Sequence, residues 1–275
     1  MALFIEGSNV SAAWVETLDR LICRGNEAVN LTVAIADPTY EEPGVRRVID
    51  AFVEARRDER RGERKGSVQR VSTVANTIFP QSFYLEHLGI DAEKHLYELE
   101  ERCRSVIHRH PNNKHGTYFE RFVAWPEKEG TTFNQLDQVV RRLRLARDRG
   151  VYRGNAYEMG LTTPADEAIA APVFIGGRDR QIMGFPCLSH VSFSLQKGVV
   201  HMAAIYRNHE FISRGYGNYL GLGRLLRFVA IQSGWPVGEL TCVSASVSLG
   251  TGKGFGKVNL QSLLRACRQA QKEAL

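Results

Sequence analysis

The chain has no apolar run long enough to span a bilayer, and residues 1–20 lack the basic-then-apolar order of a secretory signal peptide. Its five cysteines are odd in number and widely scattered, with no C-x-x-C pair and no Cys/His spacing typical of a zinc site. These absences argue against a membrane protein, a disulfide framework and a structural metal. We therefore expect a cytoplasmic protein without a bound metal ion.

Charge of both signs is present, and it points only weakly to an anionic partner. The formal net charge is +6, but 30 acidic residues accompany the 36 basic ones. The densest basic run, residues 56–65, mixes arginines with acidic side chains and contains no apolar residue. We interpret it as a solvated helix end or loop, with a nucleic-acid contact as the alternative.

Length and composition suit one compact domain. With 275 residues, 43% of them apolar, the chain can bury one large core or two small ones, and we expect a single domain over residues 1–275. Ser11 and Asp91 are expected to cap two helices. Apolar side chains at helical spacing predict helices at residues 10–23, 45–57, 91–110, 133–146, 218–233 and 258–272.

Extended structure is expected mainly in the second half of the chain. Residues 68–79 fit a strand by composition and a helix by spacing, and Pro80 ends either one. Central strands flanked by helices predict an α+β fold with a mixed or antiparallel sheet. The expected strands are residues 31–36, 171–175, 189–195, 199–206 and 240–249, with a hairpin at Lys197-Gly198.

Residues with reactive or polar side chains gather around Cys187. It opens an alternating stretch that leads to Arg207, and Asn218 follows at the start of a predicted helix. A thiol becomes a good nucleophile when a nearby cation stabilises its thiolate, and a hairpin turning near Gly198 brings one strand's start beside the next strand's end. Arg207 is therefore a candidate partner of Cys187. The alternative is that Cys187 is a small buried apolar residue.

The same stretch resembles the thymidylate synthases, which attack a pyrimidine ring with a Pro-Cys thiolate. The likeness covers residues 186–206 without a gap and, after one deletion, places Arg207 and Asn218 on the family's phosphate-binding arginine and pyrimidine-reading asparagine. Upstream, Tyr118 followed by Ala124-Trp125-Pro126 resembles the family's active-site tyrosine and its Ala-Trp-Pro segment.

This resemblance, best over residues 115–250, implies a reaction and a set of site residues. Cys187 would add to C6 of a pyrimidine and make C5 nucleophilic toward a one-carbon unit from 5,10-methylenetetrahydrofolate, giving a methylated or hydroxymethylated product. Tyr118 would belong to the network that removes the C5 proton. Arg207 would hold phosphate, and Asn218 would read the ring edge of uracil or, after rotation, of cytosine. Ser189 and Ser248 would contact substrate, and Glu210 would lie near the folate.

Departures from the family pattern argue against an ordinary thymidylate synthase. Leu188 stands where the family has a histidine after its nucleophile, and Asn76, nearest to the family's glutamate, cannot act as a carboxylate base. Ser248 and Gly250 occupy the segment whose His and Tyr hold the ribose hydroxyl. We expect a divergent enzyme that acts on a pyrimidine nucleotide or related substrate. The alternatives are a nucleotide-sensing protein on the same fold and an enzyme acting on pyrimidines in nucleic acid.

The resemblance also implies a homodimer built through the sheet. Apolar side chains occupy both alternating sets of residues 189–195 and 199–206, and a sheet with helices over one face needs a partner on the other. We therefore expect a thymidylate synthase-like mixed sheet covered by helices, with its open face used for dimerisation. Arg147, Arg149 and Arg153 lie near the position of the arginines that the family lends across its interface.

Overall fold

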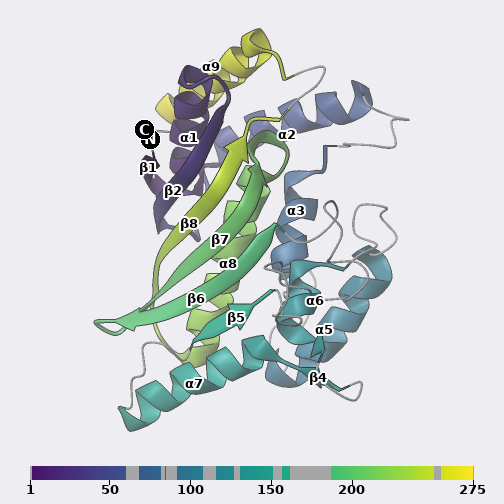
Figure 1. Ribbon diagram of the computed structural model, residues 1–275, viewed down its shortest axis with the longest axis vertical. Helices are drawn as coiled ribbons and strands as arrows, with labels where there is room; N and C mark the ends of the chain where they lie inside the picture. Colours follow the sequence, from purple (N-terminus) through teal and green to yellow (C-terminus); the bar gives the residue numbers. More distant parts are fainter. Residues whose placement is uncertain are drawn as a thin grey trace, which may run out of the picture. The chain divides into compact units, whose positions relative to one another are not determined.

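The computed structural model gives the protein an α+β fold, as expected (Figure 1). It describes residues 2–59, 68–81, 84, 92–107, 116–126, 131–150, 157–161, 187–250 and 255–274. The expected strand at residues 171–175, the Asp91 cap and Arg153 lie outside these residues.

One six-stranded sheet has the strand order β1-β2-β8-β7-β6-β5 (Figure 1). β1 runs parallel to β2, whereas β2 pairs antiparallel with β8 and β5 pairs antiparallel with β6, so the expected mixed sheet is confirmed. Two short strands, β3 and β4, form a separate antiparallel pair. The strands are β1 Leu3–Asn9, β2 Glu27–Asp37, β3 Trp125–Pro126, β4 Thr132–Phe133, β5 Glu158–Gly160, β6 Leu188–Gln196, β7 Val199–Glu210 and β8 Val237–Ser248.

All six expected helices occur, α1 with the expected ends and the others with shifted ends, and the ambiguous stretch at residues 68–79 contains a helix. A π-helical turn, η3 Phe211–Gly215, precedes helix α8. The sequence analysis missed β1, β3, β4, β5 and the short helix α6. The helices are α1 Val10–Cys23, α2 Pro43–Glu59, α3 Val71–Ile78, α5 Ala92–Ile107, α6 Tyr118–Val123, α7 Gln135–Arg149, α8 Tyr216–Ser233 and α9 Lys257–Lys272.

The expected cap of α1 and the expected start of α7 were wrong. The cap of α1 is Asn9, whose side-chain oxygen accepts a hydrogen bond from the Ala12 amide at 2.9 Å. Ser11 lies inside the helix, fully buried, and its hydroxyl is 2.8 Å from the hydroxyl of Tyr216. Helix α7 is capped by Asn134 and begins at Gln135, because Phe133 pairs in the β3-β4 ribbon.

Alternation along β2 separates a core face from an open face. Leu31, Val33 and Ile35 have no solvent exposure, whereas Thr32 and Ala34 between them are half-buried. Helix α1 packs against β1 and β2, and α9 packs against α1 and α2. Burying each large aliphatic side chain contributes about 1.5–3 kcal/mol, so this apolar face holds the helices on the sheet.

The hairpin between β6 and β7 forms at the expected turn. Lys197 and Gly198 both have positive φ angles, 51° and 75°. Two consecutive left-handed residues are the mark of a type I′ turn, whose twist matches that of the strands it joins. The hairpin prediction is confirmed.

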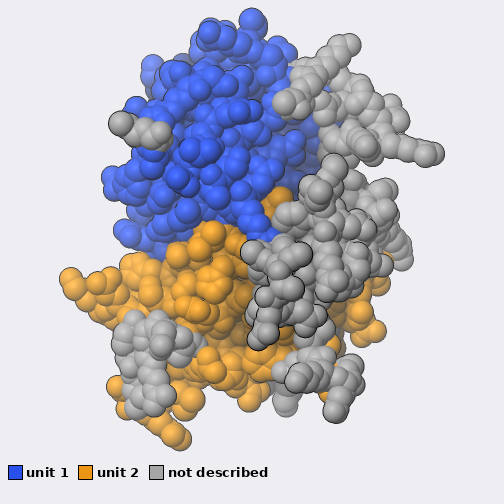
Figure 2. Space-filling view, viewed as in Figure 1, with its two compact units in different colours: residues 1–75, 206–223, 238–275 blue, residues 76–205, 224–237 orange. Residues whose placement is uncertain are grey.

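Contacts divide the chain into two compact units (Figure 2). Unit 1 comprises residues 1–75, 206–223 and 238–275, and unit 2 comprises residues 76–205 and 224–237. Strands β7 and β8 and helices α3 and α8 contribute residues to both units. The single domain expected over residues 1–275 stays a prediction.

The described residues contain neither a helix suited to span a membrane nor a cluster of side chains suited to bind a metal. No described helix combines the length and apolar character that a membrane span requires. No group of three or more described His, Cys, Asp or Glu side chains is arranged to hold a metal ion.

Candidate functional site

Cys187 lies directly before β6 and is half-buried. The next residue, Leu188, is fully buried and anchors the start of the strand. The Leu188 amide donates a long hydrogen bond of 3.5 Å to the hydroxyl of Tyr118. The structure therefore brings Tyr118 next to the segment that carries the predicted nucleophile, as the resemblance implied.

Local capping positions Tyr118 as the first residue of α6. The Thr117 hydroxyl accepts from the Glu120 amide at 3.1 Å, and the Glu120 carboxylate accepts from the Thr117 amide at 3.3 Å. This reciprocal capping box stabilises the first turn of a helix of only six residues. Phe119 and Phe122 are buried on the other side of the turn and hold α6 in the core of unit 2.

Two other predicted site residues of unit 2 already have partners. The Ser189 hydroxyl donates to the Ile205 carbonyl at 3.0 Å, which ties the start of β6 to β7. The Asn76 side-chain oxygen accepts from the Arg224 guanidinium at 3.2 Å. Ser189 keeps lone pairs that can accept from a substrate, but Asn76 in this arrangement is a hydrogen-bonding carboxamide held by a cation.

The remaining predicted site residues belong to unit 1. Arg207 is half-buried on β7, and Glu210 is exposed at its end. A Cβ atom on Gly250 would lie 3.7 Å from the Glu210 carboxylate, so this glycine backbone lies beside Glu210. The predicted set thus divides between Cys187, Tyr118, Asn76 and Ser189 in unit 2 and Arg207, Glu210, Asn218 and Ser248 in unit 1.

Asn218 occupies a buried polar cluster that the sequence analysis did not find. Only 3% of Asn218 is exposed, and its side-chain nitrogen is 2.9 Å from Nε2 of His209. The other ring nitrogen of His209, Nδ1, is 3.0 Å from the hydroxyl of Ser244. In the sequence, His209 stands three residues after the apolar Tyr206. The alternation of apolar and polar residues along β7 does not show whether a histidine at this position is buried or solvated.

The environment of His209 keeps its ring uncharged. Burial, with a smaller contribution from the positive charge of Arg214, lowers the pKa of His209 from 6.5 to about 3. The ring lies parallel to that of Tyr206, with centroids 4.5 Å apart, and meets the edges of Phe211 and Tyr219. A neutral imidazole has one donor and one acceptor, so each nitrogen of His209 has a fixed role toward its partner.

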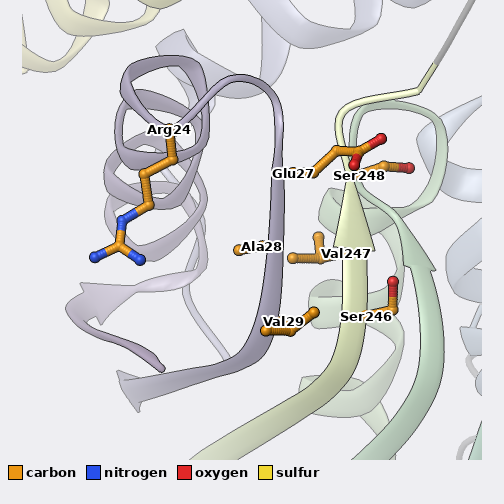
Figure 3. A pocket seen from close by; sticks show the side chains of 7 residues that line it. All are labelled: Arg24, Glu27, Ala28, Val29, Ser246, Val247 and Ser248. Atoms are coloured by element: carbon orange, nitrogen blue, oxygen red, sulfur yellow. The ribbon is translucent and has the colours of Figure 1, made fainter. Parts of the chain in front are cut away.

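A surface hollow of about 630 Å³ lies over β2 and β8 in unit 1 and includes Ser248 (Figure 3). Glu27 and Ser248 are direct partners across the two strands, and Figure 3 shows them side by side. Arg24, just after α1, also lines the hollow and was missed from the sequence. Hydroxyls and charges of both signs make this a polar surface around Ser248.

Comparison with known proteins relates the chain to a set of archaeal proteins named "Putative thymidylate synthase". It is 24% identical to the protein from Methanosarcina acetivorans over 164 residues, which cover 59% of this chain and 66% of the relative. It is 25% identical to the Methanosarcina barkeri protein over 133 residues, 48% of this chain and 52% of the relative. It is 30% identical to the Methanococcoides burtonii protein over 167 residues, 60% of this chain and 67% of the relative.

The chain is a distant member of the thymidylate synthase-like family. The match spans about half to two thirds of the length of these relatives. No protein-family model matches the chain. The family relationship supports the fold, and the activity, reaction and substrate are matters of proposal.

Burial of the cysteines predicts a sharp pattern of alkylation. Burial raises the pKa of Cys242 and of Cys267 to about 12, and Cys103 is 2% exposed. We expect iodoacetamide at neutral pH to label only Cys187 and Cys23. If Cys187 is the nucleophile, a stabilised thiolate should make it react faster than the exposed Cys23 although it is half-buried. Peptide mapping by mass spectrometry measures both rates. Slower labelling of Cys187 in the native protein, with equal rates after unfolding, would contradict an activated thiol.

The neutral state of His209 predicts acid sensitivity. Its folded pKa of about 3 lies below the unfolded value of 6.5, so between these values the unfolded chain binds one more proton and stability falls as pH falls. From about pH 6 to pH 4, the wild-type free energy of unfolding should drop by about 1.4 kcal/mol per pH unit more than that of a His209→Gln variant. Urea denaturation across this range measures the two slopes. Parallel slopes would show that His209 does not contribute.

Proposed function

We propose that this protein is a divergent thymidylate synthase-like enzyme that transfers a one-carbon unit, methyl or hydroxymethyl, to C5 of a pyrimidine nucleotide or related substrate. The observation that carries this proposal is the half-buried Cys187 directly before Leu188, whose amide donates to the Tyr118 hydroxyl, in a chain related to the thymidylate synthase-like proteins. A thiol and a phenolic hydroxyl on neighbouring segments suit a reaction that needs both a nucleophile and proton transfer.

The Cys187 thiolate adds to C6 of the pyrimidine, forming an S–C6 bond, and the C5=C6 electron pair makes C5 nucleophilic. Once C5 carries the one-carbon unit, a base would remove the C5 proton as the carrier's nitrogen leaves. Addition of a hydride from the carrier for a methyl product, or of water for a hydroxymethyl product, would then reform the C5=C6 bond and break the S–C6 bond to release the thiolate. Arg207 stabilises the thiolate and binds phosphate, because a guanidinium suits both anions. Tyr118 participates in removal of the C5 proton, and Asn218 holds the ring edge.

The chain also offers a residue suited to folate. The carboxylate of Glu210 is exposed at the end of β7 beside Gly250, where the missing side chain leaves room. A carboxylate in this position can accept hydrogen bonds from the N–H groups of a pterin ring. When bound, 5,10-methylenetetrahydrofolate would supply the one-carbon unit, and Glu210 would orient it.

A second candidate is a protein that binds the nucleotide without converting it. Asn76 replaces a carboxylate of the family pattern, and its oxygen accepts from Arg224. A carboxamide does not take up a proton at neutral pH, so this residue cannot serve as a general base. Turnover then depends on whether Tyr118 and bound water suffice for proton removal.

Trapping with a 5-fluoropyrimidine nucleotide separates these two functions. Fluorine at C5 cannot leave as a proton does, so an enzyme given 5-fluorodeoxyuridine monophosphate and methylenetetrahydrofolate should accumulate a covalent adduct. Intact-protein mass spectrometry and peptide mapping should place the adduct on Cys187. A Cys187→Ser variant should form none, while the control Cys23→Ser should react normally. Nucleotide binding without any adduct would favour the binding protein.

We also propose a homodimer formed through the open face of the sheet. On β7, Val199, His201 and Ala203 are half-buried and Ile205 is 42% exposed, while the alternate side chains are buried. Arg147 donates to the Ser233 carbonyl at 3.1 Å, so within the described residues Arg149 is the better candidate for a contact to a partner's phosphate site.

Light scattering at micromolar concentration tests the dimer. We expect a mass near twice that of the 30.9 kDa chain, and an Ile205→Lys variant should be monomeric because it places a charge in the interface. The matched control is Ile231→Lys, since Ile231 is 55% exposed on α8. A wild-type monomer, or dissociation by both variants alike, would exclude this interface.

A further inference from the structure

Three polar side chains that are almost closed to solvent form a continuous hydrogen-bonded chain across unit 1. Ser244 on β8 and His209 on β7 are each 1% exposed, and Asn218 on α8 is 3% exposed. The links measure 3.0 Å from Ser244 to His209 and 2.9 Å from His209 to Asn218. Leaving a buried polar group without a partner costs about 1–3 kcal/mol. Breaking either hydrogen bond would therefore be unfavourable, and the three side chains stay linked.

Aromatic packing holds the middle member in place. Tyr206 stacks on the His209 ring, with an interplanar angle of 6° and ring centroids 4.5 Å apart. Phe211 and Tyr219 meet the ring at 73° and 82°. The imidazole therefore cannot turn over without displacing three rings, and its remaining freedom is the position of one proton.

Counting protons sets the direction of each hydrogen bond. An amide NH₂ group can only donate, so Nε2 of His209 accepts from Asn218, and the single ring proton lies on Nδ1 and is donated to the Ser244 hydroxyl. Turning the Asn218 carboxamide over would require the ring proton to move to Nε2 and the Ser244 hydroxyl to become the donor to Nδ1.

Pyrimidines differ at the edge that a carboxamide reads. Uracil presents an N–H at position 3 beside a carbonyl at position 4, whereas cytosine presents an unprotonated nitrogen beside an amino group. A ring held in one pose therefore pairs well with only one of the two orientations of the carboxamide. A freely rotating asparagine could serve both bases, but one with a fixed orientation discriminates between them.

We propose that His209 and Ser244 fix the orientation of the Asn218 carboxamide and thereby determine whether the site prefers a uracil or a cytosine nucleotide. This inference rests on the proposed function, in which Asn218 reads the pyrimidine. His209 and Ser244 are positioning residues, because they act through Asn218.

The decisive variant is Ser244→Ala, which removes the acceptor of the ring proton while leaving Asn218 and His209 in place. Binding of deoxyuridine and deoxycytidine monophosphates is measured by calorimetry. We expect the dissociation constants of the wild type for the two nucleotides to differ by about tenfold or more, which corresponds to one mispaired buried hydrogen bond. In the variant they should differ by less than about threefold.

Two further variants separate positioning from loss of stability. Ser233→Ala is the matched control, since Ser233 is also fully buried and its hydroxyl donates to the Val229 carbonyl at 2.6 Å, away from Asn218. It should lose similar stability and keep the wild-type preference. Ser244→Thr restores a hydroxyl and should restore the preference.

A measurement without ligand tests the proton assignment. In protein labelled with ¹⁵N-histidine, NMR at pH 7 should show a neutral His209 with its proton on Nδ1, and Ser244→Ala should move part of the population to Nε2. A wild-type ring protonated on Nε2 would overturn the inference. If neither nucleotide binds the wild type, the proposed function fails and the inference fails with it. If both bind and Ser244→Ala keeps the wild-type preference, the inference alone is overturned.

Discussion

The hydrogen bonds of the buried His209 ring join the end of β7, the first turn of α8 and the middle of β8. Removing either partner would leave a buried donor or acceptor unsatisfied. The turn η3 must therefore connect β7 to α8 without moving either. Phe211 in this turn stacks on Trp14 of α1 with ring centroids 5.5 Å apart, and a Cβ atom on Gly215 would lie 2.8 Å from the Phe211 ring. The same packing that fixes the imidazole thus fixes the route of the chain into α8.

Features set by neighbouring residues were predictable from the sequence, and features set by distant pairing were not. The Lys197-Gly198 turn and the apolar stripe of α1 are local signals, and both were read correctly. Strand β1 was missed because its seven residues form a strand only through parallel pairing with β2. The cap of α1 and the start of α7 were also misplaced, since Asn9 and Ser11 can both cap a helix and Phe133 pairs in the β3-β4 ribbon.

The site shows the same division. Tyr118 and Leu188 are 70 residues apart, and only the family resemblance indicated that they meet. No resemblance pointed to Ser244, which lies 35 residues from His209 and reaches it through the order of the strands. Arg24 follows α1, where an arginine is ordinarily solvated, and only the pairing of β2 with β8 places it beside the hollow near Ser248.

Divergence from the family pattern has a physical logic at Leu188. This position has no solvent exposure, so a histidine there would need hydrogen-bond partners to offset its burial, whereas leucine needs none. The chain instead buries an imidazole at His209, where Ser244 and Asn218 satisfy both nitrogens. The orientation of a buried neutral ring depends on the side chains packed around it more than on solvent. Under the proposed function, substitutions at Tyr206 or Tyr219 that loosen this ring would alter the hold on Asn218 without touching a substrate, and substrate choice would be a property of the core.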